Sequence, residues 1–383
     1  MDLDAAPLPC PDPGEDDTPS RELAAPRPVS LDGLPRARLG LLGRSRLLPA
    51  LRGRALTVRL RRPGGRTIAH DIAGRARRVG LPVTFTPFAS AKPCSARCRF
   101  CSETLRHRDS RRLAASLRAG PGWGDRLGCV LRDLRSLPMG LSLSGLEATD
   151  DVDWLRRVVK ESRAHEAAGG CWTDKVLYSN AAGLLGGGLE ALKPLGLDRF
   201  ELSRHHEGDA ANNWIMRFRD DVAVRHTRRW LDAAHAARRL AEVRLVCVLQ
   251  KAGVSGPEGA NRYLQWASDH GLHDVVFREL ARLGDAYRDT AGKRYADDAR
   301  APAEPVAAAL LADDRFEPTE LVAGYYFWTL RGRWRGHTTV AVEASDYVEM
   351  KERHDSDVIH KLILFGDGTL GADWDPDRQV LSR

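Results

Sequence analysis

The chain has 383 residues, of which 43% are hydrophobic and 29% charged, and its formal net charge is +7. These values are typical of a globular protein, and the chain is long enough to bury a sizeable core. The sequence has no apolar run of about 18 residues, so we expect no membrane span. The N-terminus, MDLDAAPLPCPDPGEDD, is acidic and proline-rich, unlike the basic-then-apolar start of a signal peptide. We therefore expect a cytoplasmic protein whose cysteines bind metal or act in catalysis rather than form disulfides.

Charge is distributed unevenly along the chain. Residues 1–22 carry seven acidic groups and one arginine, whereas residues 36–80 carry thirteen arginines and a single aspartate. Such a basic stretch suits nucleic acid or an anionic substrate. No aromatic residue lies among these arginines to stack on bases, which disfavours a single-strand-binding surface. An arginine-rich solvated surface is the simpler interpretation, so we do not expect nucleic acid as a partner.

The N-terminal part divides into two segments. Residues 1–35 contain many prolines and aspartates and few large apolar groups, which predicts disorder. Residues 36–80 form a basic extension, in which the stretch 54–72 alternates on both sides of the Pro-Gly-Gly sequence at 63–65. That alternation predicts a β-hairpin.

Residues 81–280 alternate between strand and helix patterns. The expected strands are 81–88, 140–144, 175–179, 199–203, 242–250 and 274–280, and the expected helices are 123–137, 150–167, 226–241 and 257–271. This order predicts an α/β fold with parallel strands and crossover helices, either a partial (β/α)6 barrel or an open doubly wound sheet. In both, the chemistry collects at the carboxyl ends of the strands. We expect the partial barrel.

The alternation of strand and helix ends near residue 281. Residues 281–383 are expected to form a small α+β cap that holds substrate. The stretches 338–352 and 358–375 have the pattern of antiparallel strands joined by turns such as Asp367-Gly368.

Three of the seven cysteines, Cys94, Cys98 and Cys101, lie within eight residues of the sequence PCSARCRFCSE. A structural zinc would need a fourth nearby ligand, and the nearest His is His107. A catalytic zinc of the deaminase type would bring an upstream H-x-E motif, which is absent. Three cysteines suit an iron–sulfur cube with one iron left without a protein ligand.

The spacing C-x3-C-x2-C, with the aromatic Phe100 before the last cysteine and a position after the first barrel strand, resembles the radical S-adenosylmethionine enzymes. The resemblance implies a [4Fe-4S] cluster bound by Cys94, Cys98 and Cys101, whose remaining iron is chelated by the amino and carboxylate groups of S-adenosyl-L-methionine. It also implies that an electron from the cluster cleaves the cofactor to a 5′-deoxyadenosyl radical, which abstracts hydrogen from substrate. An external one-electron reductant of the flavodoxin or ferredoxin type would be a partner.

The sequence Gly145-Leu146-Glu147 stands where the family has Gly-Gly-Glu at the end of the second strand. The resemblance implies that Gly145 and Glu147 hold the methionyl ammonium. The middle leucine departs from the family pattern. As an alternative, Glu147 caps the helix that follows.

Other segments are similar to the viperin and molybdopterin GTP cyclase-like branch of the family. No cysteine follows Cys247, so we expect no auxiliary cluster in this chain. Ser203 ends the fourth strand and Arg217 follows fourteen residues later, so the resemblance implies contacts with the cofactor's ribose or carboxylate. A guanidinium binds carboxylate through two parallel bonds. The sequence YSNAAG resembles the family's T-N-G segment, so Ser179 and Asn180 are expected to face the cofactor, and Val248 to line the adenine.

Several side chains are candidates for contact with substrate. The proposed catalytic residues are His205, His206, Arg278 and Tyr326, which follow or end strands or lie in the cap. The alternatives are a packing pair for the histidines, an internal ion pair for Arg278 and a place in the cap core for Tyr326.

Three arginines at alternate positions surround Trp334 in the sequence RGRWRGH. They are Arg331, Arg333 and Arg335. On a strand they would share one face, so we expect them to clamp an anionic substrate over the mouth of the barrel. The alternative is a solvated edge strand.

Three functions are compatible with the sequence. The first is a radical S-adenosylmethionine enzyme that acts on a small, anionic biosynthetic intermediate such as a nucleotide, sugar or amino-acid derivative. The second is the same chemistry on a peptide or protein. The third is a non-catalytic, metal-bearing protein that binds nucleic acid through the basic extension. The reaction that follows hydrogen abstraction depends on the pocket.

Overall fold

A computed structural model describes residues 31, 34–54, 56–60, 66–88, 94–101, 119–284, 289–353, 357–374 and 378–383. The predicted disorder of residues 1–35 falls almost wholly outside these ranges, as does the Pro-Gly-Gly sequence at 63–65. Among the residues that the structure describes, no helix is long and apolar enough to cross a membrane.

Six consecutive parallel strands form the centre of the fold, as the sequence predicts. They are β3 (Arg75–Pro87), β4 (Pro138–Leu143), β5 (Cys171–Ser179), β6 (Arg199–Ser203), β7 (Glu242–Leu249) and β8 (Asp274–Glu279). Each strand pairs in parallel with the next one along the chain. The α/β fold class with a partial barrel is therefore confirmed.

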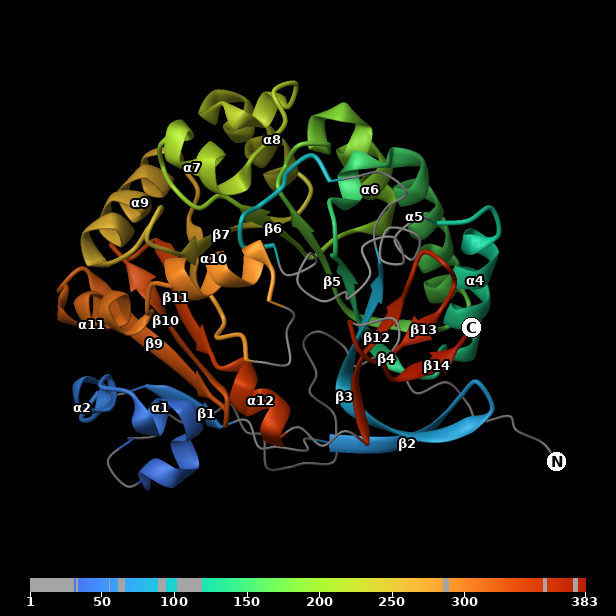
Figure 1. Ribbon diagram of the computed structural model, residues 1–383, viewed down its shortest axis with the longest axis horizontal. Coiled ribbons are helices and arrows are strands. Elements are labelled where there is room, and N and C mark those ends of the chain that lie inside the picture. Colours follow the sequence, from blue (N-terminus) through green and yellow to red (C-terminus); the bar gives the residue numbers. More distant parts are fainter. Residues whose placement is uncertain are drawn as a thin grey trace.

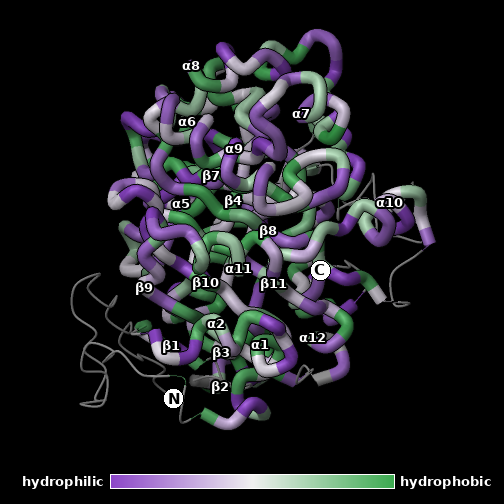
Figure 2. The backbone as a smooth tube through the Cα atoms, turned by 90° about the vertical axis from the view of Figure 1, so that its left-hand side faces the viewer, coloured by the Kyte–Doolittle hydropathy of each residue, from purple (hydrophilic) through white to green (hydrophobic). Residues whose placement is uncertain are grey.

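Helices connect these strands and lie on the outer side of the curved sheet (Figure 1). They are α4 (Trp123–Asp133), α5 (Val152–Ala167), α6 (Leu189–Leu192), α7 (Asp209–Met216), α8 (Thr227–Arg238) and α9 (Pro257–Asp269). Hydrophobic and hydrophilic residues alternate along these helices in Figure 2, as expected for helices with one buried face. The buried face packs on the sheet: Trp154 of α5 and Trp230 of α8 are fully buried in the main core.

The predicted hairpin over 54–72 is wrong. The strand β1 (Thr57–Leu60) pairs in parallel with β9 (Phe316–Ala323), and β2 (Arg66–Ile72) pairs antiparallel with β3. The tight turn lies instead at Ala73 and Gly74, whose φ values of 54° and 75° suit a two-residue hairpin. Alternation predicts that a segment is a strand but does not say which strand it joins.

The C-terminal residues extend the same sheet at both edges rather than forming a separate small sheet. The remaining strands are β10 (Phe327–Trp334), β11 (Thr338–Ser345), β12 (Val358–Leu364), β13 (Leu370–Gly371) and β14 (Val380–Ser382). The strands β9, β10 and β11 form an antiparallel meander, β11 then pairs in parallel with β8, and β12 pairs in parallel with β3. The remaining α-helices are α1 (Gly40–Arg44), α2 (Leu48–Leu51), α10 (Ala291–Ala299), α11 (Glu304–Ala312) and α12 (Tyr347–Arg353).

The expectation for the two C-terminal stretches is confirmed only in part. The turn that contains Asp367 and Gly368 does join the antiparallel strands β12 and β13. The stretches 338–352 and 358–375 lie at opposite ends of the barrel sheet, and each has a parallel neighbour. A short sequence cannot reveal this because the partner strands lie far away along the chain.

The packing of β12 against β3 gives a stability prediction. Leu362 of β12 is fully buried in the main core, so Leu362→Ala should lower the free energy of unfolding by roughly 2–5 kcal/mol. Urea denaturation measures this change. The matched control is Leu240→Ala, because Leu240 is 39% exposed and its loss should cost less than about 0.5 kcal/mol. Equal losses of unfolding free energy in the two variants would contradict the placement of β12 within the main sheet.

Candidate functional site

The cysteine loop, residues 94–101, follows β3 at the carboxyl ends of the barrel strands. The end of α7 fixes its backbone. The amide of Arg97 donates to the carbonyl of Met216 at 2.9 Å, and the amide of Arg99 donates to the carbonyl of Ile215 at 3.1 Å. Parallel α/β barrels gather their functional groups at this end, so the loop has the position of a functional segment.

The three thiols of the cysteine loop influence one another electrostatically. Burial and, to a smaller extent, the nearby charges of Glu147 and Cys101 together raise the pKa of Cys94 to about 12. Burial also raises the pKa of Cys98, with further contributions from Cys101 and Cys94. The thiols therefore lie within electrostatic range of one another in a partly water-excluded region.

This donor set fits an iron–sulfur cluster. Within the described ranges, no three His, Cys, Asp or Glu side chains converge as ligands of a single metal ion. In a four-iron cluster each cysteine binds a separate iron, so its ligands do not need to converge on one point. Metal binding would hold the thiols as thiolates and offset the burial that raises their pKa.

Glu147 lies in the loop that follows β4, and its buried side chain is turned towards the end of β5. Its Oε1 accepts hydrogen bonds from the amide and hydroxyl of Thr149 at 3.2 and 2.6 Å and from the hydroxyl of Ser179 at 2.8 Å. Its Oε2 accepts from the amide of Asn180 at 2.6 Å. Burial nevertheless raises the pKa of Glu147 to about 7. Glu147 thus caps the short helix at 148–150, and Oε2 keeps the greater capacity for a further donor.

Gly145 occupies a position that requires glycine. Its φ of 112° is unfavourable for other residues, and a Cβ atom there would lie 2.9 Å from the ring of Phe88. The neighbouring Leu146 is half-buried and is not among the residues with a positive φ, so its backbone does not require glycine.

Asn180 links the end of β5 to the cysteine loop. Its Nδ2 donates to Ser95 Oγ at 2.9 Å and lies 3.7 Å from Cys94 Sγ. The amide of Ser95 donates to Asp150 Oδ2 at 2.5 Å. The sequence reasoning missed Ser95 and Asp150. An aspartate at the start of a helix is ordinary as a cap, and only the three-dimensional structure shows that this one bonds to the loop.

The end of α7 brings Arg217 beside the cysteine loop. The preceding residue, Met216, places its Sδ 3.6 Å from Cys98 Sγ. Arg217 ends the helix in a left-handed conformation with φ of 51°, and its side chain is exposed. Ser203 is half-buried at the end of β6. Contacts of these two side chains with a cofactor remain predictions.

His205 has a structural position. Its Nδ1 accepts a hydrogen bond from the amide of Val248 at 3.0 Å, and its own amide donates to Asn212 Oδ1 at 2.9 Å. Its ring meets Phe100 edge to face with 5.0 Å between centroids, and Phe100 packs against Val248 and Leu280. Burial lowers the pKa of His205 to about 3, so the ring is neutral and fits the packing alternative better than proton transfer near pH 7.

The other proposed catalytic residues lie in partly accessible positions. Nδ1 of His206 accepts from the amide of Gly208 at 2.9 Å. Arg278 of β8 donates from Nε to Glu343 Oε2 at 2.8 Å, which is the internal ion pair of the alternative interpretation. Tyr326 precedes β10, and burial raises its pKa to about 12.

A charged network that the sequence reasoning missed lies on the sheet face opposite the main core. Glu201 of β6 is paired across the sheet with Tyr178 and Arg244. Its Oε2 lies 3.8 Å from Nη2 of Arg278, which also contacts Glu343, and among described residues Oε2 has no hydrogen-bond partner. The sequence does contain a signal for this network: charged residues at alternate positions of otherwise apolar strands, such as Glu201 in RFELS.

The predicted substrate clamp of Arg331, Arg333 and Arg335 is wrong. Arg331 forms an ion pair with Glu320 at 3.1 Å, so its charge already has an acidic partner within the protein. Arg333 pairs with Thr339, which in turn pairs with Asp274 at the start of β8. Because β10 runs antiparallel to the barrel strands, Arg333 and Arg335 lie towards the amino ends of those strands, away from the cysteine loop, and Arg331 lies level with Val276 in the middle of β8.

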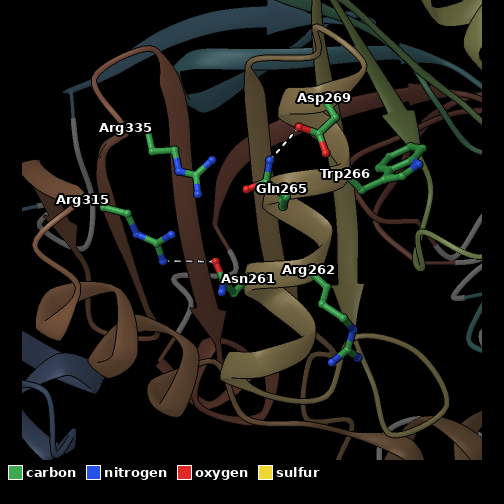
Figure 3. A pocket seen from close by; sticks show the side chains of 7 residues that line it. All are labelled: Asn261, Arg262, Gln265, Trp266, Asp269, Arg315 and Arg335. Atoms are coloured by element: carbon green, nitrogen blue, oxygen red, sulfur yellow. Dashed lines mark hydrogen bonds between the residues drawn. The ribbon is translucent and has the colours of Figure 1, made fainter.

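A surface pocket of about 430 Å³ lies beside α9 at some distance along the chain from the loop (Figure 3). It is lined by Asn261, Arg262, Gln265, Trp266, Asp269, Arg315 and Arg335. Arg262 pairs with Glu207 at 3.2 Å and Arg315 with Asp313 at 2.8 Å, so two of its three guanidiniums are already neutralised. None of the predicted cofactor residues lines this pocket.

No family model matches the chain, and neither does any curated protein. Solved structures with some likeness include SuiB of Streptococcus suis bound to the precursor peptide SuiA, with 17% identity, a TM-score of 0.37, and coverage of 51% of this chain and 39% of that one. Another is anSMEcpe with bound AdoMet and a Cp18Cys peptide, with 13% identity, a TM-score of 0.39, and coverage of 51% and 49%.

A third is the coproporphyrinogen III oxidase HemN of Escherichia coli, described as a radical SAM enzyme, with 11% identity, a TM-score of 0.42, and coverage of 69% and 72%. The chain thus matches half or less of the first two proteins. All three TM-scores are below 0.5.

The buried, neutral state of His205 predicts a pH dependence of stability. The pKa of His205 in the folded protein, about 3, lies below the ordinary value of 6.5. Between these two pH values the unfolded chain binds a proton at His205 and the folded protein does not. Stability from this group is complete above about pH 6.5 and declines as the pH falls towards 3. At pH 5 the loss should be about 2 kcal/mol relative to pH 7.5.

Urea denaturation of wild type and His205→Gln at both pH values tests this, since the glutamine amide oxygen can accept the same bond from Val248 without titrating. The wild type should lose more stability than the variant. An equal loss in the two proteins would show that His205 is accessible to protons.

Proposed function

We propose that this protein is a radical S-adenosylmethionine enzyme that binds a [4Fe-4S] cluster through Cys94, Cys98 and Cys101. The observation that carries the proposal is the cysteine loop itself: three mutually interacting thiols at the carboxyl end of the first barrel strand. The spacing of these cysteines and the position of Phe100 before the last one support the same assignment.

The residues around the loop have the chemistry to hold the two cofactors. Cluster and S-adenosylmethionine, when bound, would supply the one-electron cleavage and hydrogen abstraction that amino-acid side chains cannot perform. Oε2 of Glu147 would accept from the methionyl ammonium, and the ammonium would favour the ionised carboxylate that burial now disfavours. The side chain of Asn180 connects Ser95 and Cys94 to the end of β5.

Arg217 and Ser203 remain proposed contacts of the cofactor's carboxylate and ribose, with Ser179, Gly145 and Val248 as supporting positions. The exposed guanidinium of Arg217 has no salt bridge within the described part of the chain and is one residue from the contact of Met216 with Cys98. A carboxylate could therefore bind it without displacing a protein partner.

For the substrate we propose a small polar molecule. The arginine clamp that favoured an anion lies at the wrong end of the sheet. Arg278 and Glu201 on the barrel face are better contacts, and they suit a group that both donates and accepts hydrogen bonds, because Arg278 is neutralised by Glu343. Modification of a peptide is the second candidate, with the basic residues 36–80 as its docking element.

Anaerobic reconstitution with iron and sulfide tests the proposal. The protein should turn brown, bind about four irons per chain, and form 5′-deoxyadenosine from S-adenosylmethionine with a chemical reductant. Cys94→Ala, Cys98→Ala and Cys101→Ala should each abolish cluster assembly, because each substitution leaves a second iron without a protein ligand. Cys129→Ala is the matched control and should retain full iron content, since Cys129 lies on α4 away from the loop. Normal iron and turnover in any of the three loop variants would contradict the proposal.

Glu147→Ala tests the cofactor contact separately. This variant should keep its iron and weaken binding of S-adenosylmethionine by roughly 1.5–3 kcal/mol, the range for a hydrogen bond to a charged group. Equilibrium binding to the reconstituted protein measures the change. Glu190→Ala, on the exposed side of α6, should bind as the wild type does. An unchanged affinity in Glu147→Ala would limit Glu147 to capping the helix at 148–150.

A further inference from the structure

An exposed tryptophan that stacks with an arginine lies directly beside the cysteine loop. Trp214 of α7 is 46% exposed, although a tryptophan normally buries most of its surface. The guanidinium of Arg99 stacks on its ring at 3.8 Å from the centroid. Arg97 and Arg219, the second of which lies close to Trp214 along the chain, are also exposed. We call these four residues the Trp214 surface.

Backbone and side-chain bonds connect the Trp214 surface to the cysteine loop. Nε of Arg99 donates to the carbonyl of Trp214 at 2.9 Å, and the amide of Arg219 donates to the carbonyl of Ser95 at 3.3 Å. The amide of Arg97 bonds to Met216, whose sulfur contacts Cys98. The surface is therefore rigidly attached to the segment that would hold the cluster.

The surface is positively charged even when its acidic neighbours are counted. Asp220 is paired with Arg225 at 2.6 Å, and Asp221 lies 3.6 Å from Arg219. Both aspartates are highly exposed, at 99% and 77%, so water screens these pairs strongly. Tryptophan and arginine are the residues most enriched among the energetic centres of protein interfaces.

From this placement we infer that the Trp214 surface docks a small acidic one-electron donor protein of the flavodoxin type. The inference rests on the proposed function, which requires an electron from outside the chain. In the docked complex the donor would be oxidised by one electron and the cluster reduced by one, and no group or proton would pass between the proteins. The arginines would steer the acidic partner, and Trp214 would bury its ring against it.

An acidic peptide substrate is the competing occupant. Its reacting atom would have to reach the barrel face, where Glu201 and Arg278 lie, whereas the Trp214 surface is hydrogen-bonded to the cysteine loop at Arg99 and Ser95. An electron donor needs only close approach to the loop. The position of the surface therefore favours the donor protein.

The experiment compares wild type with the double variant Arg97→Glu/Arg219→Glu and with Trp214→Ala. Binding of a purified bacterial flavodoxin is measured by calorimetry at low and high salt, on both the iron-loaded and the iron-free full chain. The double charge reversal should weaken binding at low salt by at least about tenfold and flatten its salt dependence, and Trp214→Ala should weaken binding at both salt concentrations. The cluster of each variant should still be reduced by dithionite.

The control is Arg157→Glu/Arg163→Glu, which makes the same change of charge at exposed positions on α5. It should bind flavodoxin within about twofold of the wild type. Wild-type affinity in the Arg97→Glu/Arg219→Glu protein, or no binding of flavodoxin by wild type, would overturn the inference. Absence of a cluster would instead contradict the proposed function, and iron content reveals that before any binding is measured.

Discussion

The proposed chemistry depends on how one short loop is held from both sides. On one side the carbonyls of Ile215 and Met216, at the end of α7, accept the amides of Arg99 and Arg97. On the other, Asn180 and Asp150 hold Ser95. A loop between two cysteines has little apolar surface of its own, so these bonds give it one conformation. Three thiols can then face one volume before any metal binds, which reduces the entropic cost of binding.

The same region contains a buried carboxylate whose ionisation is unfavourable without a partner. Glu147 accepts four hydrogen bonds, and burial still raises its pKa to about 7. A bound cation would reverse that balance, because an opposite charge at hydrogen-bond distance favours the ionised form. His205, held neutral by burial behind Phe100, contributes rigidity rather than charge. The site thus contains two kinds of polar group: those that stabilise the structure, such as His205, and those that can still bind a ligand, such as Glu147.

Local patterns were sufficient to predict the barrel, and long-range pairing limited the rest. Strands such as 199–203 and helices such as 257–271 were recognisable because hydrophobic period and turn residues are properties of neighbouring positions. The parallel pairing of β12 with β3, and of β1 with β9, joins segments more than 250 residues apart, which no local pattern encodes. The same limit made Arg331 resemble a ligand, since Glu320 becomes its partner only through the β9–β10 pairing. The spacing of the three cysteines was the most informative local pattern. The roles of Ser95, Asp150 and Glu201, in contrast, depend on contacts that only the three-dimensional structure shows.

We propose that the cysteine loop holds a cluster with one iron open to S-adenosylmethionine. Electron paramagnetic resonance of the reduced, reconstituted protein tests this assignment. We expect a signal from a reduced four-iron cluster that changes when S-adenosylmethionine is added and is missing in Cys98→Ala. A colourless protein that binds one zinc per chain, or a cluster signal that S-adenosylmethionine leaves unchanged, would contradict it.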